Sequence, residues 1–164
     1  MLKDTAIDGA WTAASAISST LPWQSVAYGN GKFVAVSFTG SVQTRIMYST
    51  DGINWTASST TATQGLEWTS VTYGELPDGT QRFVAVANYG DSNRVMYSAD
   101  GINWSATTST NETIQWESVT YADDKFVAVS ANGSSNRAMY SADGINWLAG
   151  SGPTEKGDWT SVTY

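Results

Sequence analysis

The carboxylates and tyrosines are the first candidates for acid–base or nucleophilic chemistry in this chain, because it contains neither histidine nor cysteine. The Ser-His-Asp triad, the imidazole base and the thiolate nucleophile are therefore excluded. Two carboxylates about 5–10 Å apart can hydrolyse a glycosidic bond, but the adjacent pair Asp123 and Asp124 lies beside Lys125 in a predicted hairpin turn. We interpret this pair as a solvated turn and predict no catalytic residue, metal site or cofactor.

The composition also excludes two classes of partner. Only 14% of the residues are charged and the formal net charge is −7, whereas nucleic-acid binding needs a basic surface. No apolar run approaches the roughly 20 residues of a membrane helix, and the first residues lack the apolar region of a signal peptide. The abundance of Ser, Thr, Gly, Trp and Tyr favours an extracellular, cell-surface or virion protein.

A tandem repeat organises the chain. The motif Trp-x-Ser-Val-x-Tyr begins at positions 23, 68, 116 and 159, with spacings of 45, 48 and 43 residues. Each of the first three copies is followed by Phe-Val-Ala-Val, then Arg-x-Met-Tyr-Ser, then Asp-Gly-Ile-Asn-Trp. The eight tryptophans all occupy repeat positions, namely 11, 23, 55, 68, 104, 116, 147 and 159. Such self-similarity is the mark of a repeat architecture.

Each repeat predicts four short strands, because its segments are rich in Val, Ile, Thr and aromatic residues. The Asp-Gly pair between the third and fourth segments is typical of a tight turn with positive φ. Four antiparallel strands in 43–48 residues, repeated in tandem, indicate the blades of an all-β propeller. A single blade cannot cover both faces of its sheet, so we expect the tryptophans to fill the wedges between blades.

The repeat spacing predicts complete blades at 23–67, 68–115 and 116–158. Residues 1–22 are expected to hold the last strand of a preceding blade, and residues 159–164 the first strand of a further one. Closed propellers have about four to eight blades, and open β edges are an aggregation hazard. Either this is a piece of a longer repeat protein, which the stop inside a repeat favours, or copies self-associate through their open terminal blades. We expect the isolated chain not to be a stable soluble monomer.

The third link of each repeat, Ser-x-Asp-Gly-x-x-Trp, resembles the Asp-box, or BNR-like repeat, of sialidase-type and sortilin-type propellers. It is one residue shorter than the usual box between Asp and Trp. The resemblance implies a turn between the third and fourth strands, in which the Asp side chain accepts backbone hydrogen bonds. The residues to which we assign this structural role are Ser49, Asp51, Gly52, Trp55, Ser98, Asp100, Gly101, Trp104, Ser141, Asp143, Gly144 and Trp147.

The sialidase resemblance also implies three arginines that clamp a substrate carboxylate and a Tyr–Glu nucleophile pair. Here Arg45, Arg94 and Arg137 are copies of one repeat position, so they would be spread around a ring rather than converge on one point. We interpret them as structural donors, one in each blade, and predict that the chain is not an enzyme.

The repeats differ most in two sets of loops, 38–44, 88–93 and 131–136 within blades and 58–66, 106–115 and 149–158 between blades. Propeller geometry places both sets on one face. The candidate ligand-binding residues there are Phe38, Gln43, Tyr89, Asp91, Asn93, Asn132 and Asn136. Rings that stack and amides that hydrogen-bond are recognition chemistry.

We therefore hypothesise a non-catalytic recognition or adhesion module for a glycan or a cell-surface partner. Low-charge repeats of this kind resemble those of phage tail and bacterial surface proteins. Two alternatives stay open. One is a fragment of a sialidase-like glycoside hydrolase whose catalytic residues lie elsewhere, and the other is a purely structural virion or assembly component.

Overall fold

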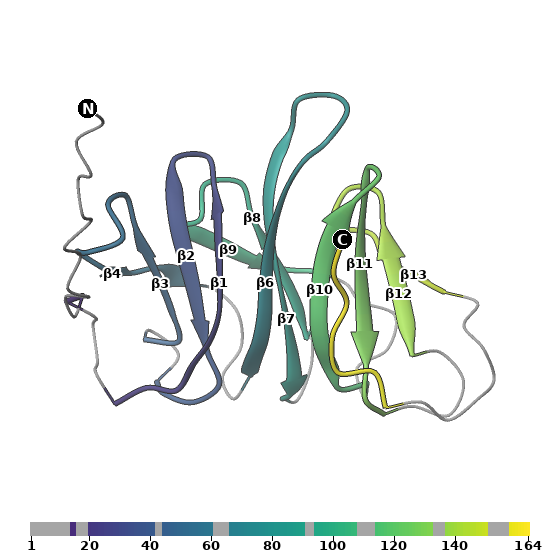
Figure 1. Ribbon diagram of the computed structural model, residues 1–164, viewed down its shortest axis with the longest axis horizontal. Coiled ribbons are helices and arrows are strands. Elements are labelled where there is room, and N and C mark those ends of the chain that lie inside the picture. The colour runs from purple at the N-terminus through teal and green to yellow at the C-terminus, as the bar shows by residue number, and fades with distance from the viewer. Residues whose placement is uncertain are drawn as a thin grey trace, which may run out of the picture.

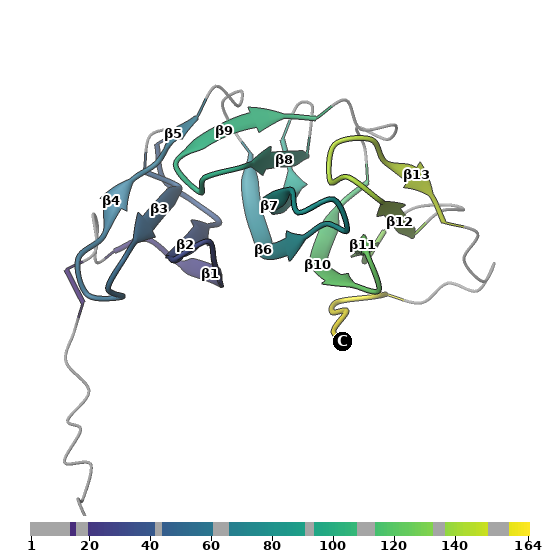
Figure 2. The ribbon, with the colours of Figure 1, turned by 90° about the horizontal axis from the view of Figure 1, so that it is seen from above.

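The structure, a computed structural model, describes residues 14–15, 20–41, 44–60, 66–90, 94–107, 114–132, 137–150 and 158–164. Within these ranges the chain forms thirteen strands and no helix, so no helix here could span a membrane. The strands build three sheets that stand side by side as an arc (Figures 1 and 2). The prediction of an all-β propeller built of four-stranded antiparallel blades is confirmed.

The four strands of each blade follow the chain order, with the first strand on the concave side of the arc and the fourth on its outer side (Figure 2). Blade 1 consists of β1 (Trp23–Gly29), β2 (Lys32–Ser37), β3 (Ile46–Ser49) and β4 (Thr56–Ala57). Blade 2 consists of β6 (Glu67–Glu75), β7 (Gln81–Tyr89), β8 (Val95–Ser98) and β9 (Asn103–Ala106). Blade 3 consists of β10 (Trp116–Ala122), β11 (Lys125–Ser130), β12 (Ala138–Ser141) and β13 (Leu148–Ala149).

The hairpins between the first and second strands keep one register in all three blades. Tyr28 pairs with Phe33, Tyr73 with Phe83 and Tyr121 with Phe126. In blade 3 the tight turn is made by Asp123 and Asp124, whose φ angles of 46° and 58° lie in the left-handed region, which Asp tolerates better than most residues. This pair therefore forms a hairpin turn.

The outer edges of neighbouring blades are joined by short parallel contacts that the repeat pattern did not predict. The strand β5 (Ser59–Thr60), which follows β4 in the range of blade 1, pairs in parallel with β9 of blade 2. Ser15 makes the equivalent bridge to Asn54 of blade 1, and its N–H donates to the Ile53 carbonyl at 2.9 Å. The outer edges of blades 1 and 2 thus each receive the chain that arrives from the preceding repeat.

Two apolar cores lie between the blades rather than within them. We call the side of a sheet that faces the preceding blade its leading face, and the opposite side its trailing face. The core between blades 1 and 2 combines trailing-face Val34, Val36 and Ile46 with leading-face Trp68, Val71, Phe83, Met96 and Trp104. The core between blades 2 and 3 combines Val84, Val86 and Val95 with Trp116, Val119, Phe126, Met139 and Trp147. The four tryptophans in these cores are only 2–3% exposed.

Serine side chains connect the first strands of successive blades. The Ser25 Oγ accepts the Val71 N–H at 3.2 Å, and the Ser70 Oγ accepts the Val119 N–H at 3.2 Å. The Ser118 Oγ accepts the Val162 N–H at 3.2 Å in the same way. Residues 158–164 therefore lie beside β10 in the position of a further first strand, although they make no strand pairing of their own.

Candidate functional site

The three Ser-x-Asp-Gly-x-x-Trp turns have nearly identical internal hydrogen bonds. In each, the Ser Oγ donates to the Asp Oδ1 at 2.9–3.0 Å and accepts the Gly N–H at 2.8–2.9 Å. The same Asp Oδ1 accepts the backbone N–H groups two and three residues later at 2.7–2.8 Å, and the Asn side-chain amide donates to Oδ2. The glycines have φ angles of 70–73°, so a side chain there would be strained. The carboxylates thus have their hydrogen-bond partners within their own turns.

These contacts lower the pKa of all three carboxyls. For Asp51, the hydrogen bonds from the backbone and side chain of Asn54 contribute most to the lower pKa. At Asp100 and Asp143, desolvation by burial raises the pKa, but the hydrogen bonds from the turn outweigh it and bring the pKa to about 2. Lowered values mean that these groups are ionised at neutral pH and are poorly suited to act as general acids.

This titration predicts a loss of stability in acid. A carboxyl whose folded pKa lies below its ordinary value of 3.8 binds fewer protons in the folded state, so its stabilisation is present above that value and is lost as the pH falls toward 2. We expect the urea midpoint of unfolding to fall between pH 5 and pH 2, and to fall less in Asp100→Asn. The exposed hairpin residue Asp123 lies outside these turns, so Asp123→Asn supplies the matched control for the loss of one carboxylate. An equal acid response of Asp100→Asn and the wild type would contradict this origin.

The repeated arginines bind backbone carbonyl groups or an aspartate carboxylate at the junctions between blades. The Arg94 guanidinium, 9% exposed, donates to the Gly90 carbonyl at 3.1 Å and to the Ile114 carbonyl at 2.9 Å. Arg45 makes the equivalent contacts to the carbonyls of Gly40 and Leu66. Each of these two thus joins the loop within its blade to the residues that enter the next blade, which confirms their interpretation as structural donors.

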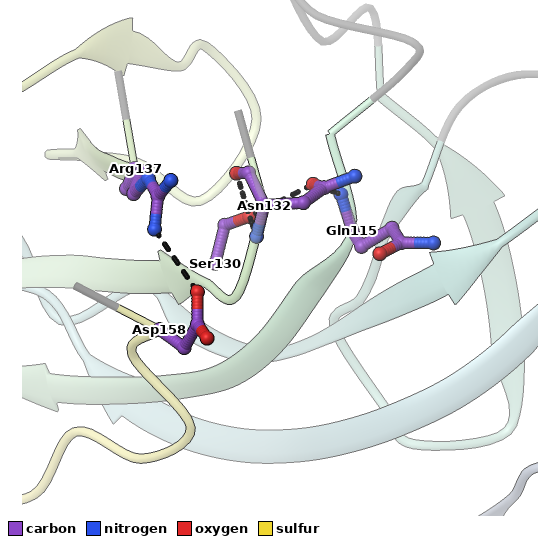
Figure 3. A network of polar contacts seen from close by, with 5 residues as sticks. All are labelled: Gln115, Ser130, Asn132, Arg137 and Asp158. Atoms are coloured by element: carbon purple, nitrogen blue, oxygen red, sulfur yellow. Dashed lines mark hydrogen bonds and ion pairs between the residues drawn. The ribbon is translucent and has the colours of Figure 1, made fainter. Parts of the chain in front are cut away.

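In blade 3 the contacts of the same arginine position include an ion pair. The Arg137 Nη1 lies 3.3 Å from the Asp158 Oδ1, on the segment that follows blade 3 (Figure 3). The sequence alone did not predict this choice of partner, because the acceptor lies in a linker that differs in every repeat.

The candidate ligand-binding residues that the structure describes lie beyond or at the ends of the second strands, at the edge of the arc opposite the hairpins (Figure 1). We call this edge the loop face. Phe38 is partly buried, and its N–H donates to the Pro22 carbonyl at 3.3 Å, whereas Tyr89 is 59% exposed. Four other candidates, Gln43, Asp91, Asn93 and Asn136, lie outside the described residues.

Asn132 is held in a small hydrogen-bond network. Its Oδ1 accepts the Gln115 N–H at 2.7 Å, and its N–H donates to the Ser130 Oγ at 3.1 Å (Figure 3). The network therefore joins the end of β11 to the start of β10. The Asn132 side chain has a structural role in this junction, which the sequence analysis did not foresee.

A contact between blades 2 and 3 brings further residues to the same region. The Asn88 Nδ2 donates to the Glu117 Oε1 at 3.4 Å, and Asn88 precedes the exposed Tyr89 at the end of β7. The only sequence signal for these residues is that they depart from their counterparts in the other repeats. The residues of the loop face that these contacts bring near the ends of β7 and β11 are called the loop-face cluster. Its members are Asn88, Tyr89, Gln115, Glu117 and Asn132. Among the described residues, no group of three or more acidic side chains could hold a metal ion.

No family model and no curated protein matches this chain. Among solved structures, it is similar to the computationally designed Ika4 protein, with a TM-score of 0.65 and 11% identity over 95% of this chain and 88% of that one. It is also similar to YCF48 bound to D1 peptide, with a TM-score of 0.58 and 16% identity over 87% of this chain and 44% of that one.

The Niastella koreensis GH74 enzyme also matches, with a TM-score of 0.47 and 21% identity over 77% of this chain and 17% of that one. This chain therefore spans less than half of the YCF48 chain and a smaller part still of the GH74 enzyme. At these identities the similarity shows the fold alone. The chain is a protein of the β-propeller class, composed of tandem four-stranded blades.

Proposed function

We propose that this chain is a non-catalytic recognition module that binds glycans through its loop-face cluster. The observation that carries the proposal is the contrast between the two edges of the blades. One edge holds three nearly identical turns whose carboxylates are bonded internally. At the other edge lie the described ends of the loops that differ between repeats, and an exposed tyrosine.

The loop-face cluster has the chemistry of a sugar-binding surface. Tyr89 offers a flat ring, 59% exposed, on which the apolar face of a sugar can stack. Glu117 offers a carboxylate oxygen, and the side-chain amide of Gln115 offers a donor and an acceptor to hydroxyl groups. Tyr89 and Glu117 are held by the strands β7 and β10, and the Asn88–Glu117 hydrogen bond joins blades 2 and 3, which lowers the entropy cost of binding.

The same cluster argues against hydrolysis. Glycoside hydrolysis uses two carboxyl groups, and the cluster contains one, Glu117. The Asp-box-like carboxylates lie in the turns of the opposite edge, and Arg45 and Arg94 bind backbone carbonyls. We therefore propose binding without catalysis, at a bacterial or phage surface where weak contacts in repeated blades can add to useful avidity.

A glycan array followed by titration calorimetry tests this function. We expect Tyr89→Ala to weaken binding of the best glycan on the order of tenfold, because one stacking contact is lost. Tyr164→Ala is the matched control, since Tyr164 is 95% exposed and lies outside the loop-face cluster; it should bind as the wild type does. An array without a bound glycan, equal affinity of Tyr89→Ala, or release of reducing sugar from the bound glycan would overturn the proposal.

A further inference from the structure

Most of the exposed large apolar side chains outside the loop face and the segment 158–164 lie on two free sheet faces. On the leading face of blade 1, Val26 is 59% exposed and Tyr28 is 60% exposed, and Ile53 in the adjoining turn is 60% exposed. On the trailing face of blade 3, Leu148 is 58% exposed and Tyr140 is 39% exposed. Contiguous apolar surface of this kind marks an interaction site.

The leading face of blade 1 carries the same residue types that are buried in the other blades. Val71 and Val119, the counterparts of Val26, are each only 5% exposed because the preceding blade covers them. Trp55 is partly exposed, whereas its counterparts Trp104 and Trp147 are 2% and 3% exposed. This face therefore has the composition of an interface that the chain itself forms twice.

The trailing face of blade 3 has the complementary composition. Tyr140 pairs across the sheet with Leu148, so both side chains lie on one face. The counterparts of Tyr140, Tyr48 and Tyr97, pack against the two cores. The repeat position of Leu148 is occupied by Thr56 in blade 1 and by Ser105 in blade 2. Blade 3 therefore presents a more apolar trailing face than its neighbours.

We propose that the leading face of blade 1 binds the trailing face of blade 3 of a second copy of this chain, head to tail. The blades that the structure describes number six in two copies, which lies within the range of about four to eight for closed propellers. The pair then closes as a dimer in which a two-fold axis relates two contacts of the same kind. Three copies would exceed that range, so the dimer is the favoured assembly.

In this dimer the incoming β1 takes the place of residues 158–164. This segment carries the same Trp-x-Ser-Val-x-Tyr motif as β1, and its contacts include the Ser118–Val162 hydrogen bonds and the Arg137–Asp158 ion pair. Trp159 is 47% exposed and Tyr164 is 95% exposed, so the segment is less buried than the first strands of blades 2 and 3. It competes with the second copy for one surface.

Sedimentation velocity over a concentration series tests this proposal. We expect the wild type to sediment as a dimer, and both Val26→Lys and Leu148→Lys to sediment as monomers, because each places a charge in one half of the contact. Tyr89→Lys is the matched control: it changes an equally exposed apolar side chain outside the two faces and should remain a dimer. Circular dichroism of each variant checks that it is folded.

Mixing the two monomeric variants separates a head-to-tail contact from any other. The unaltered leading face of Leu148→Lys can bind the unaltered trailing face of Val26→Lys, so the mixture should recover dimers. Deletion of residues 158–164 should raise the dimer fraction of the otherwise wild-type chain. A wild type that is monomeric throughout, species that grow beyond the dimer, a mixture that stays monomeric or a deletion that lowers the dimer fraction would overturn the proposal.

Discussion

Replacing Trp104 with alanine should lower the free energy of unfolding by about 3–5 kcal/mol, the usual cost of removing a large buried aromatic side chain. Trp104 is 2% exposed and lies in the core between blades 1 and 2. Its Nε1–H also donates to the Gly101 carbonyl of its own turn at 3.3 Å. Chemical denaturation followed by tryptophan fluorescence or circular dichroism measures the change.

The repeat supplies the control for this substitution. Trp55 makes the same hydrogen bond within its own turn, to the Gly52 carbonyl at 3.2 Å, but its ring is partly exposed on the leading face of blade 1. We expect Trp55→Ala to cost clearly less than Trp104→Ala when both are measured in the Val26→Lys background, where a second copy should not cover Trp55. Equal costs would mean that the ring stabilises its own turn and not the packing between blades.

Gly74→Ala should destabilise the contact between blades 2 and 3 by about 1–3 kcal/mol, the typical cost of overpacking a well-packed core. A Cβ atom on Gly74 would lie 2.5 Å from the ring of Tyr121 and 2.9 Å from the ring of Phe126. The hydroxyl of Tyr121 donates to the Glu75 carbonyl at 2.7 Å, which limits how far the ring can move. The change is measured as the shift of the denaturation midpoint at constant slope.

Two further variants show whether the tyrosine ring is the cause. In a Tyr121→Ala background the additional cost of Gly74→Ala should become smaller, because contacting residues couple in a double-mutant cycle; the cost that remains comes from the Phe126 ring. Ala122 already occupies the equivalent position in blade 3, and Ala122→Gly should change stability only by the general cost of glycine in a strand, about 0.5–1 kcal/mol. An undiminished cost of Gly74→Ala without the ring would contradict the steric explanation.

The blades and their turns were predictable because the forces that form them act over a few residues. Asp51, Asp100 and Asp143 bind backbone groups two and three residues away, so the motif contains its own partners. The parallel contact of Ser59–Thr60 with β9 was not predictable in this way. It depends on how closely the outer edges of two blades approach, and no local pattern records that distance.

The loop-face cluster shows the same limit for the candidate site. Tyr89 and Asn132 could be selected from the sequence as variable residues at the ends of second strands. The contact of Asn88 with Glu117, and that of Gln115 with Asn132, join residues 29 and 17 positions apart. They arise because β10 of one blade lies beside β7 and β11, which is a property of the packed sheets.

The sequence by itself determined the four strands of each blade, the blade class and the internal geometry of the three turns, since short-range turn chemistry and strand patterning produce these. Only the tertiary structure decided which copy of each repeated residue is buried. Val26, Val71 and Val119 occur in the same motif, yet their side chains are 59%, 5% and 5% exposed. Burial depends on whether a neighbouring blade covers the face, and identical local sequences cannot encode a difference that comes from the neighbour.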